Sequence, residues 1–187
     1  CVLEDVEAVG SMDLKAAGDL LYVVGMTKNE LGGSHYFMIH GRLGNRAPEV
    51  DVELGARVLD AVSRAIAAGT VRACHDCSEG GIGVAIAEMA FAGGFGVEAD
   101  LRQVPRAPDV DRSDHALFSE SNTRFVVEVP PESRAAFESA LGDVPFGRFG
   151  TVASGKRLTI QGLRGARVVS GEIRELKEAW QAPLRSP

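Results

Sequence analysis

The sequence predicts an α+β fold with a mixed β-sheet, and three observations lead to this fold class. Segments with strand-like and helix-like patterns interleave without a strict β-α-β rhythm. Residues 20–24, Leu-Leu-Tyr-Val-Val, form a continuous apolar run that is typical of a strand buried on both faces. The last third of the chain holds short apolar runs separated by glycine turns, which predicts several strands paired as hairpins.

The composition indicates an ordinary globular domain. The chain has 187 residues, of which 45% are hydrophobic and 25% charged, so we expect residues 1–187 to form a single domain with a sizeable core. No apolar run approaches the roughly 20 residues of a membrane span, and no signal peptide opens the chain. The formal net charge is −6 with no basic block, which argues against a nucleic-acid or membrane partner.

The first part of the chain contains two expected strands and one helix. Val2–Val9 and Leu20–Val24 are the strands, separated by a break at residues 15–18, and Gly32-Gly33-Ser34 is a turn. A loop over residues 41–48 leads to a helix that starts after Asp51 and is closed by Gly69. Its apolar face has helical spacing: Leu54, Val58, Ala61, Val62 and Ala65.

The centre of the chain is a strand, a polar glycine turn and a helix. An apolar run from Val71 ends at Cys74, and the helix that follows is stopped by Gly93-Gly94. Ser78 stands where an N-cap residue is expected, and Gly80-Gly81 allows close approach of the backbone to a ligand. The apolar positions of the helix are Ile82, Ala85, Ile86, Met89 and Ala90.

The remaining elements are shorter. After a strand over residues 96–101, we expect a surface loop over residues 103–115 and a half-buried strand over residues 124–129. A short helix starts at Pro131. Three strands at 147–152, 157–160 and 167–169, a closing helix at 173–180 and a frayed tail at 182–187 complete the chain.

A strand that leads into a helix N-terminus is suited to bind phosphate, because it presents free N–H groups and the positive end of the helix dipole. Asp76, at the end of this strand, is placed to hold the accompanying cation. The alternative is that Asp76 only caps the helix and the glycine turn is only a turn.

Three motifs in order resemble the phosphoribosylformylglycinamidine synthase family. They are Thr27-Lys-Asn-Glu-Leu-Gly-Gly-Ser34, His75-Asp-Cys-Ser-Glu-Gly-Gly81 and Leu117-Phe-Ser-Glu-Ser-Asn-Thr-Arg-Phe125. The resemblance covers essentially the whole chain and is to the C-terminal domain of the synthetase subunit. It implies a three-layer α/β/α domain of the kind found at the C-terminus of aminoimidazole ribonucleotide synthetase. Because the chain starts at Cys1 within a strand-like run, we expect it to be cut from a longer protein.

The resemblance also implies a function for the whole enzyme. Such a synthase makes formylglycinamidine ribonucleotide from formylglycinamide ribonucleotide, glutamine-derived ammonia and ATP, with Mg²⁺, in the cytoplasm. The implied partners are the upstream domains of the same subunit, a glutaminase subunit and a small accessory subunit. The catalytic histidines of the family belong to the first domain, so no catalytic residue is expected in this chain and it should be inactive alone.

The resemblance assigns roles to several positions. It implies Asp76 as a Mg²⁺ ligand and Ser78, with Gly80 and Gly81, as contacts to an auxiliary nucleotide. Glu120 and Ser121 correspond to substrate-binding residues of the duplicated first half, so they either line a second cleft or only bond their own loop. The face carrying Gly32-Gly33-Ser34 and this pair is expected to meet a neighbouring domain.

Alternatives remain for the whole chain and for two local features. The chain resembles, less closely, aminoimidazole ribonucleotide synthetase and the selenophosphate and thiamine-phosphate kinases, and it is also interpretable as a structural domain with an empty cleft. Cys74 and Cys77 form a Cys-x-x-Cys pair, but no second ligand pair is spaced for zinc, which favours two reduced, mostly buried thiols. We expect His75 to point away from Asp76 and to be structural.

Overall fold

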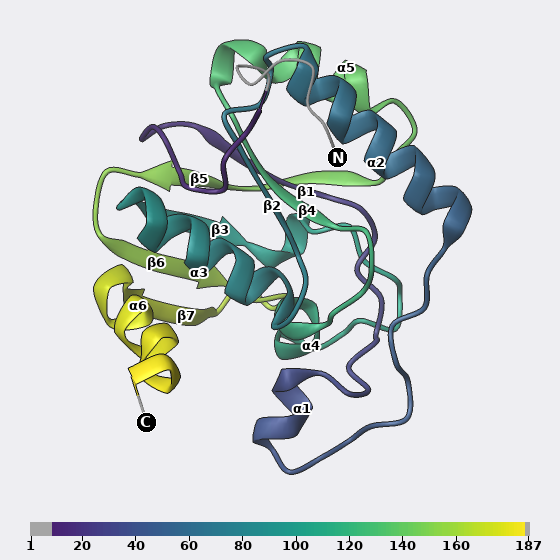
Figure 1. The fold of residues 1–187 in the computed structure, drawn as a ribbon, viewed down its shortest axis with the longest axis vertical. Helices are drawn as coiled ribbons and strands as arrows, with labels where there is room; N and C mark the ends of the chain where they lie inside the picture. The colour runs from purple at the N-terminus through teal and green to yellow at the C-terminus, as the bar shows by residue number, and fades with distance from the viewer. Residues whose placement is uncertain (1–8, 186–187) are drawn as a thin grey trace.

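A seven-stranded mixed sheet forms the centre of the computed structural model, which describes residues 9–185 (Figure 1). The strand order is β2-β4-β1-β5-β3-β6-β7. The β3–β6 pair is parallel, and the other neighbouring strands are antiparallel. The strands are β1 (Leu20–Val24), β2 (Ala73–Asp76), β3 (Gly96–Asp100), β4 (Phe125–Val129), β5 (Phe146–Ala153), β6 (Arg157–Gln161) and β7 (Arg167–Glu172).

Helices cover both faces of the sheet, as Figure 1 shows, which confirms the expected three-layer α/β/α architecture. One face is covered by α2 and α5, and the other by α3, α4 and α6, while α1 lies beyond the end of the sheet. The helices are α1 (His35–Ile39), α2 (Val52–Ala67), α3 (Gly81–Gly93), α4 (Ser113–Phe118), α5 (Arg134–Leu141) and α6 (Ile173–Gln181). Short 3₁₀ turns span Leu101–Gln103, Pro131–Ser133 and Ala182–Arg185.

The apolar run at Leu20–Val24 is the central strand, as predicted. Because side chains alternate across a strand, Leu21 and Val23 join the core under α3, whereas Leu20, Tyr22 and Val24 join the core under α2 and α5. All five residues are buried, since β1 has β4 on one side and β5 on the other. A residue in such a strand has to be apolar on either face, which explains the missing alternation.

The long helix α2 also follows the prediction. The Asp51 carboxylate accepts a hydrogen bond from the Leu54 N–H at 3.0 Å and caps the first turn. Gly69, at φ +67°, ends the helix in the left-handed region. The expected face packs on the sheet through Val58, Ala61, Val62 and Ala65.

Several local predictions were wrong. The expected loop at 103–115 ends at Arg112, because α4 starts at Ser113, and α1 was not predicted at all. Both helices have only five or six residues, too few to show a 3.6-residue period. Residues 182–185 form a 3₁₀ turn rather than a frayed tail. The expected strand Val2–Val9 lies almost wholly outside the described residues.

The predicted pairing of one pair of strands was wrong, and so was the predicted burial of another strand. Consecutive strands form a hairpin at β6–β7, but β5 and β6 are separated by β3, which pairs with both. The strand at 125–129 is not half-buried, because β4 lies between β2 and β1 and has helices over both faces. Within residues 9–185, no helix is both long and apolar enough to cross a bilayer.

Candidate functional site

The predicted strand–turn–helix is present, with β2 ending at Asp76 and α3 beginning at Gly81. The turn is held by hydrogen bonds from the Cys77 N–H to the Arg124 carbonyl (2.9 Å) and from the Gly81 N–H to the Ser78 carbonyl (3.0 Å). The N-cap is Gly80, in the left-handed region at φ +79°, and not Ser78. The turn therefore runs two residues beyond the expected cap, and the exposed Ser78 side chain makes no capping bond.

The two glycines are explained by packing within the chain. A Cβ atom at Gly81 would lie 2.3 Å from the Ser119 carbonyl oxygen and 2.7 Å from that of Leu117. A Cβ atom at Gly80 would overlap the Val84 side chain at 2.2 Å. Gly81 thus does permit a close approach, but the approaching backbone is the end of α4 and the residue that follows it.

Glu120 ties the glycine turn to α1. Its Oε1 accepts hydrogen bonds from the Gly80 N–H at 2.9 Å and from the His35 N–H at 3.1 Å. A carboxylate at the N-termini of two helices is stabilised by their N–H groups and dipoles. The structure therefore brings two predicted site residues, Gly80 and Glu120, into direct contact at one place.

Ser121 is turned into the chain. It is 1% exposed, and its hydroxyl accepts a hydrogen bond from the Lys28 N–H at 3.0 Å and lies 3.0 Å from the Ser119 hydroxyl. The serine therefore lines no cleft, and its backbone partner is not its own loop but the loop at Lys28, 93 residues away in the sequence. Ser34 is also 1% exposed and caps α1 by accepting the Phe37 N–H. The face expected to meet a neighbouring domain through these serines is therefore interior rather than free surface.

Arg124 supports this loop and was not singled out from the sequence. It is 1% exposed, and its guanidinium donates to the carbonyls of Ser119 and Ser121 and, at 2.9 Å, to the Thr27 hydroxyl. Burial lowers the pKa of Arg124, since the charged form is poorly solvated there. The buried cation fixes the segment that carries Glu120.

Asp76 is exposed at the end of β2, with 61% of its side chain accessible. One of its oxygens lies 3.3 Å from Nδ1 of His75, whose Nε2 lies 2.7 Å from the Glu88 carboxylate on α3. Trp180 on α6 donates to the other oxygen of Glu88 at 2.7 Å. The prediction that His75 points away from Asp76 is therefore wrong, because the ring packs toward α3 with its Nδ1 beside the Asp76 carboxylate.

The residues present fit part of a Mg²⁺–nucleotide site. Asp76 supplies one carboxylate, and Mg²⁺ takes one or two from a protein together with phosphate oxygens and water. The N–H groups of Ile82 and Gly83 have no acceptor among the described residues, so they are available to a phosphate. No cluster of three or more His, Cys, Asp or Glu side chains within residues 9–185 is arranged to hold a metal.

Cys74 and Cys77 are free thiols on opposite faces of the sheet, Cys74 under α2 and Cys77 under α3. Burial raises the pKa of Cys74 to about 12 and that of Cys77 to about 11. The expectation that the two thiols are mostly buried is confirmed, and because the thiolate is the reactive form, their raised pKa values favour low reactivity.

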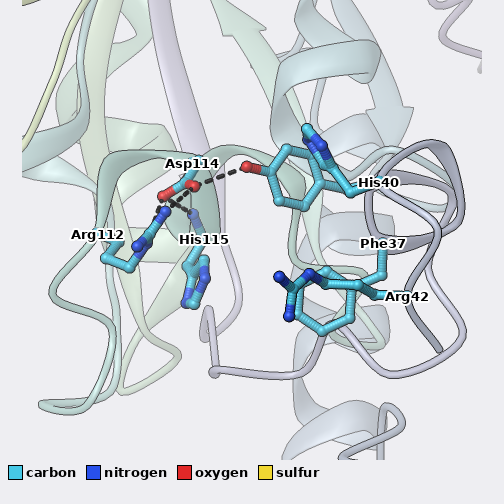
Figure 2. A pocket seen from close by; sticks show the side chains of 7 residues that line it. Phe37, His40, Arg42, Arg112, Asp114 and His115 are labelled. Atoms are coloured by element: carbon cyan, nitrogen blue, oxygen red, sulfur yellow. Dashed lines mark hydrogen bonds and ion pairs between the residues drawn. The ribbon is translucent and has the colours of Figure 1, made fainter. Parts of the chain in front are cut away.

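A cavity of about 520 Å³ lies between α1 and the start of α4 (Figure 2). Phe37 and Arg42 line one side, and Arg112, Asp114 and His115 line the other. These two segments are about 70 residues apart in the chain, so no local motif reveals the site. The one signal in the sequence is the concentration of charged and imidazole groups at 112–115, within the stretch expected to be a loop.

Comparisons with known proteins identify the domain family to which the chain belongs. A family described as "AIR synthase related protein, C-terminal domain" matches residues 16–162. Phosphoribosylformylglycinamidine synthase subunit PurL of Alkaliphilus metalliredigens (strain QYMF) is 35% identical over 98% of this chain, which spans 24% of that relative. T. maritima PurL complexed with FGAR has a TM-score of 0.79 at 18% identity, over 91% of this chain and 30% of that one. E. coli HypE, a hydrogenase maturation protein, has a TM-score of 0.62 at 21% identity, over 85% and 51%. Both structural likenesses concern the fold.

Proposed function

We propose that this chain is the C-terminal domain of a phosphoribosylformylglycinamidine synthase. The proposal starts from the family, because the chain belongs to the AIR synthase related proteins and matches their C-terminal domain. The observation that carries the proposal is the 35% identity to PurL over 98% of the chain. Since the chain spans only 24% of that relative, we assign the activity to the assembled protein and not to these 187 residues.

The proposed reaction is an ATP-dependent formation of a carbon–nitrogen bond in purine biosynthesis. ATP transfers its γ-phosphoryl group to the amide oxygen of formylglycinamide ribonucleotide. Ammonia from glutamine then displaces that oxygen as phosphate, giving formylglycinamidine ribonucleotide, ADP and phosphate. We assign no general acid or base for these steps to this chain and propose that its role is to position groups and to neutralise charge.

Within this function, Asp76 would hold Mg²⁺, while Ser78 and the first turn of α3, beginning at Gly80-Gly81, would meet nucleotide phosphate. Three observations support this assignment: both side chains are exposed, free N–H groups remain in the turn, and the helix dipole favours an anion. Several T. maritima PurL structures contain ADP, ATP or AMPPCP. A bound Mg²⁺ ion would neutralise part of the phosphate charge of a nucleotide at the turn between β2 and α3.

We assign Glu120 to positioning the turn rather than to direct substrate contact, because its Oε1 already bonds the Gly80 and His35 N–H groups. Ser121 is proposed to act in the same indirect way, through its bonds to Lys28. His75 would orient Asp76, since its ring lies between that carboxylate and Glu88.

We propose that the partners are the remaining domains of the polypeptide, a glutaminase subunit and a small accessory subunit, all in the cytoplasm. One neighbour in the structural comparison is PurLQS from Thermotoga maritima. An exposed apolar segment at residues 38–52 supports a covering partner, because large exposed patches mark interfaces. Half of the large exposed apolar side chains of the described residues lie in it: Met38, Ile39, Leu43, Val50 and Val52.

One observation favours a second candidate, a structural domain without nucleotide. The Glu120 carboxylate occupies the Gly80 N–H and would repel a phosphate placed beside it. In this alternative, Asp76 is only an exposed acid at a strand end, and the glycines serve the packing described above.

The test is Asp76→Asn in the full polypeptide, with Asp143→Asn as control because that carboxylate is exposed on the opposite side of the sheet, beyond α5. We expect the purified Asp76 variant to lose bound nucleotide and to melt at a lower temperature. A ligand present at a hundredfold excess over its dissociation constant stabilises the native state by about 2.7 kcal/mol. Unchanged nucleotide content and melting temperature would establish the structural alternative. Absence of synthase activity in the unmodified full polypeptide with ATP, Mg²⁺ and ammonia would refute the proposed function itself.

A further inference from the structure

The cavity between α1 and α4 has the size and the lining of a small-molecule site. Its volume of about 520 Å³ lies within the roughly 300–1,000 Å³ that ligand pockets occupy. Figure 2 shows the Arg42 guanidinium and the His115 ring facing the same space from opposite walls. None of its lining residues belongs to the β2–α3 turn, so this cavity is separate from the proposed nucleotide site.

The acidic group of the cavity is already neutralised. Asp114 Oδ1 accepts hydrogen bonds from Arg112 Nε (3.0 Å) and from the His115 N–H (3.1 Å). Its Oδ2 accepts from Arg112 Nη2 (2.6 Å) and from the Tyr36 hydroxyl (2.7 Å). The Arg112 guanidinium, with these bonds, holds the pKa of Asp114 well below its usual range. Asp114 therefore fixes the orientation of Arg112 and has little remaining capacity to bind or repel a ligand.

The lining of the cavity has more positive than negative charge. The Arg42 guanidinium has no ion-pair or hydrogen-bond partner among residues 9–185, and neither has the Nη1 group of Arg112. With one aspartate and two arginines, the lining carries an excess positive charge on a chain whose formal net charge is −6. Cations on an acidic protein normally find acidic partners, so the unpaired Arg42 guanidinium and the free Nη1 group of Arg112 at one cavity indicate an anionic ligand.

His115 adds a neutral donor. Its Nδ1 is buried and has no hydrogen-bond partner in the described part of the chain. We assign the proton of the neutral ring to Nε2, because a bare buried acceptor is better tolerated than an orphaned N–H group. The ring then brings an N–H donor to the space that Figure 2 shows between the two walls.

We propose that this cavity binds a phosphate monoester of a small polar molecule. The planar forks of Arg42 and Arg112 match phosphate oxygens, and charge-assisted bonds of this kind are about twice as strong as neutral ones. The cavity is much larger than a phosphate group, and the Phe37 ring leaves room for an organic body beside it. The arginines and imidazoles around that body favour a polar one.

The first experiment follows amide resonances of the ¹⁵N-labelled protein during titration. The probes are inorganic phosphate, glycerol 3-phosphate and glucose 6-phosphate, with uncharged glucose as the comparison. Both esters are expected to bind with saturation, more tightly than inorganic phosphate, and to shift the amides of Arg42, Arg112 and His115. Glucose is expected to leave them unmoved. No saturable shift with any phosphate at millimolar concentration overturns the proposal, as does tighter binding of inorganic phosphate than of both esters.

The second experiment compares variants of equal charge. Arg42→Gln is expected to weaken ester binding about tenfold, the loss of one charge-assisted hydrogen bond. Arg167→Gln removes an exposed arginine from β7, away from the cavity, and is expected to leave the affinity unchanged. If both variants weaken ester binding equally, the effect comes from the net charge of the protein and not from the cavity, and the proposal is overturned. If Arg42→Gln lowers the melting temperature, Arg42→Lys takes its place, and unchanged affinity in that variant also overturns the role of the arginine fork.

Discussion

Glu128 is a buried carboxyl group whose ionisation opposes folding. It lies in β4, is 0% exposed, and has Leu21 of β1 and Ala73 of β2 as its neighbours across the sheet. Its carboxylate accepts hydrogen bonds from the N–H groups of Lys15 and Ala16 at 2.9–3.1 Å. Asp19, 3% exposed, lies beside it and forms an ion pair with Arg72 at 3.0 Å. Of these two buried acids, Asp19 has a cation within ion-pair distance among the described residues, and Glu128 has none.

Burial raises the pKa of Glu128 to about 7 from an ordinary value of 4.5, and the nearby Asp19 adds to the rise. The folded state therefore keeps a proton that the unfolded chain has released. The stability contributed by this proton is complete below pH 4.5, falls as the pH rises, and is gone above about pH 7. At about 1.4 kcal/mol for each pH unit, the loss amounts to about 3 kcal/mol.

Glu128→Gln keeps the shape of the protonated group and removes its titration. We expect the variant to match the wild type near pH 4.5 and to exceed it by up to about 3 kcal/mol in unfolding free energy at pH 8. The measurement is urea unfolding followed by circular dichroism at pH 5, 6, 7 and 8. Glu98→Gln, at an exposed residue of β3, serves as control. Its unfolding free energy should change with pH in the same way as that of the wild type. The reasoning would be refuted if the unfolding free energy of Glu128→Gln changed with pH as the wild type's does, or if the variant were less stable than the wild type at pH 8.

Two further predictions concern groups buried in the same sheet and its loops. Arg124→Met leaves the Ser119 and Ser121 carbonyls without their donor, so we expect a loss of about 3–5 kcal/mol in unfolding free energy. The exposed Arg134→Met is the control, and a loss in Arg124→Met no larger than in that variant would contradict the assignment. In a Cys1→Ser background, Cys74 and Cys77 should react with a thiol reagent at pH 8 far more slowly in the native than in the unfolded protein, because burial raises the pKa of each. Native rates close to those of the unfolded chain would show that these thiols are accessible.

The parts of the fold that the sequence predicted are those specified by local patterns. The run at Leu20–Val24 identified the central strand, and the cap at Asp51 with the period that follows identified α2. The turn between β2 and α3 was found because its glycines and its apolar helix are contiguous, although its end was placed two residues too early. In each case the physical signal lies within about 20 residues of chain.

The rest depends on contacts between distant segments. Nothing near Glu120 indicates that its carboxylate bonds Gly80 and His35, and nothing near Glu128 indicates that β4 has a strand on each side. Ser78 looked like a cap because serine is favoured there, but the left-handed Gly80 took that position. The cavity was missed for the same reason, because Arg42 and Arg112 come to line one space only after the chain has folded.

The place of β1 in the sheet has a consequence for how the protein is made. β1 ends at Val24, while its partners β4 and β5 begin at Phe125 and Phe146. A ribosome that adds about 5–20 residues each second completes the first partner roughly 5–20 s after the central strand has been synthesised. For that interval the most apolar strand of the protein has no neighbour to pair with. Until its second half emerges, the nascent chain therefore exposes an unpaired apolar strand, which favours aggregation.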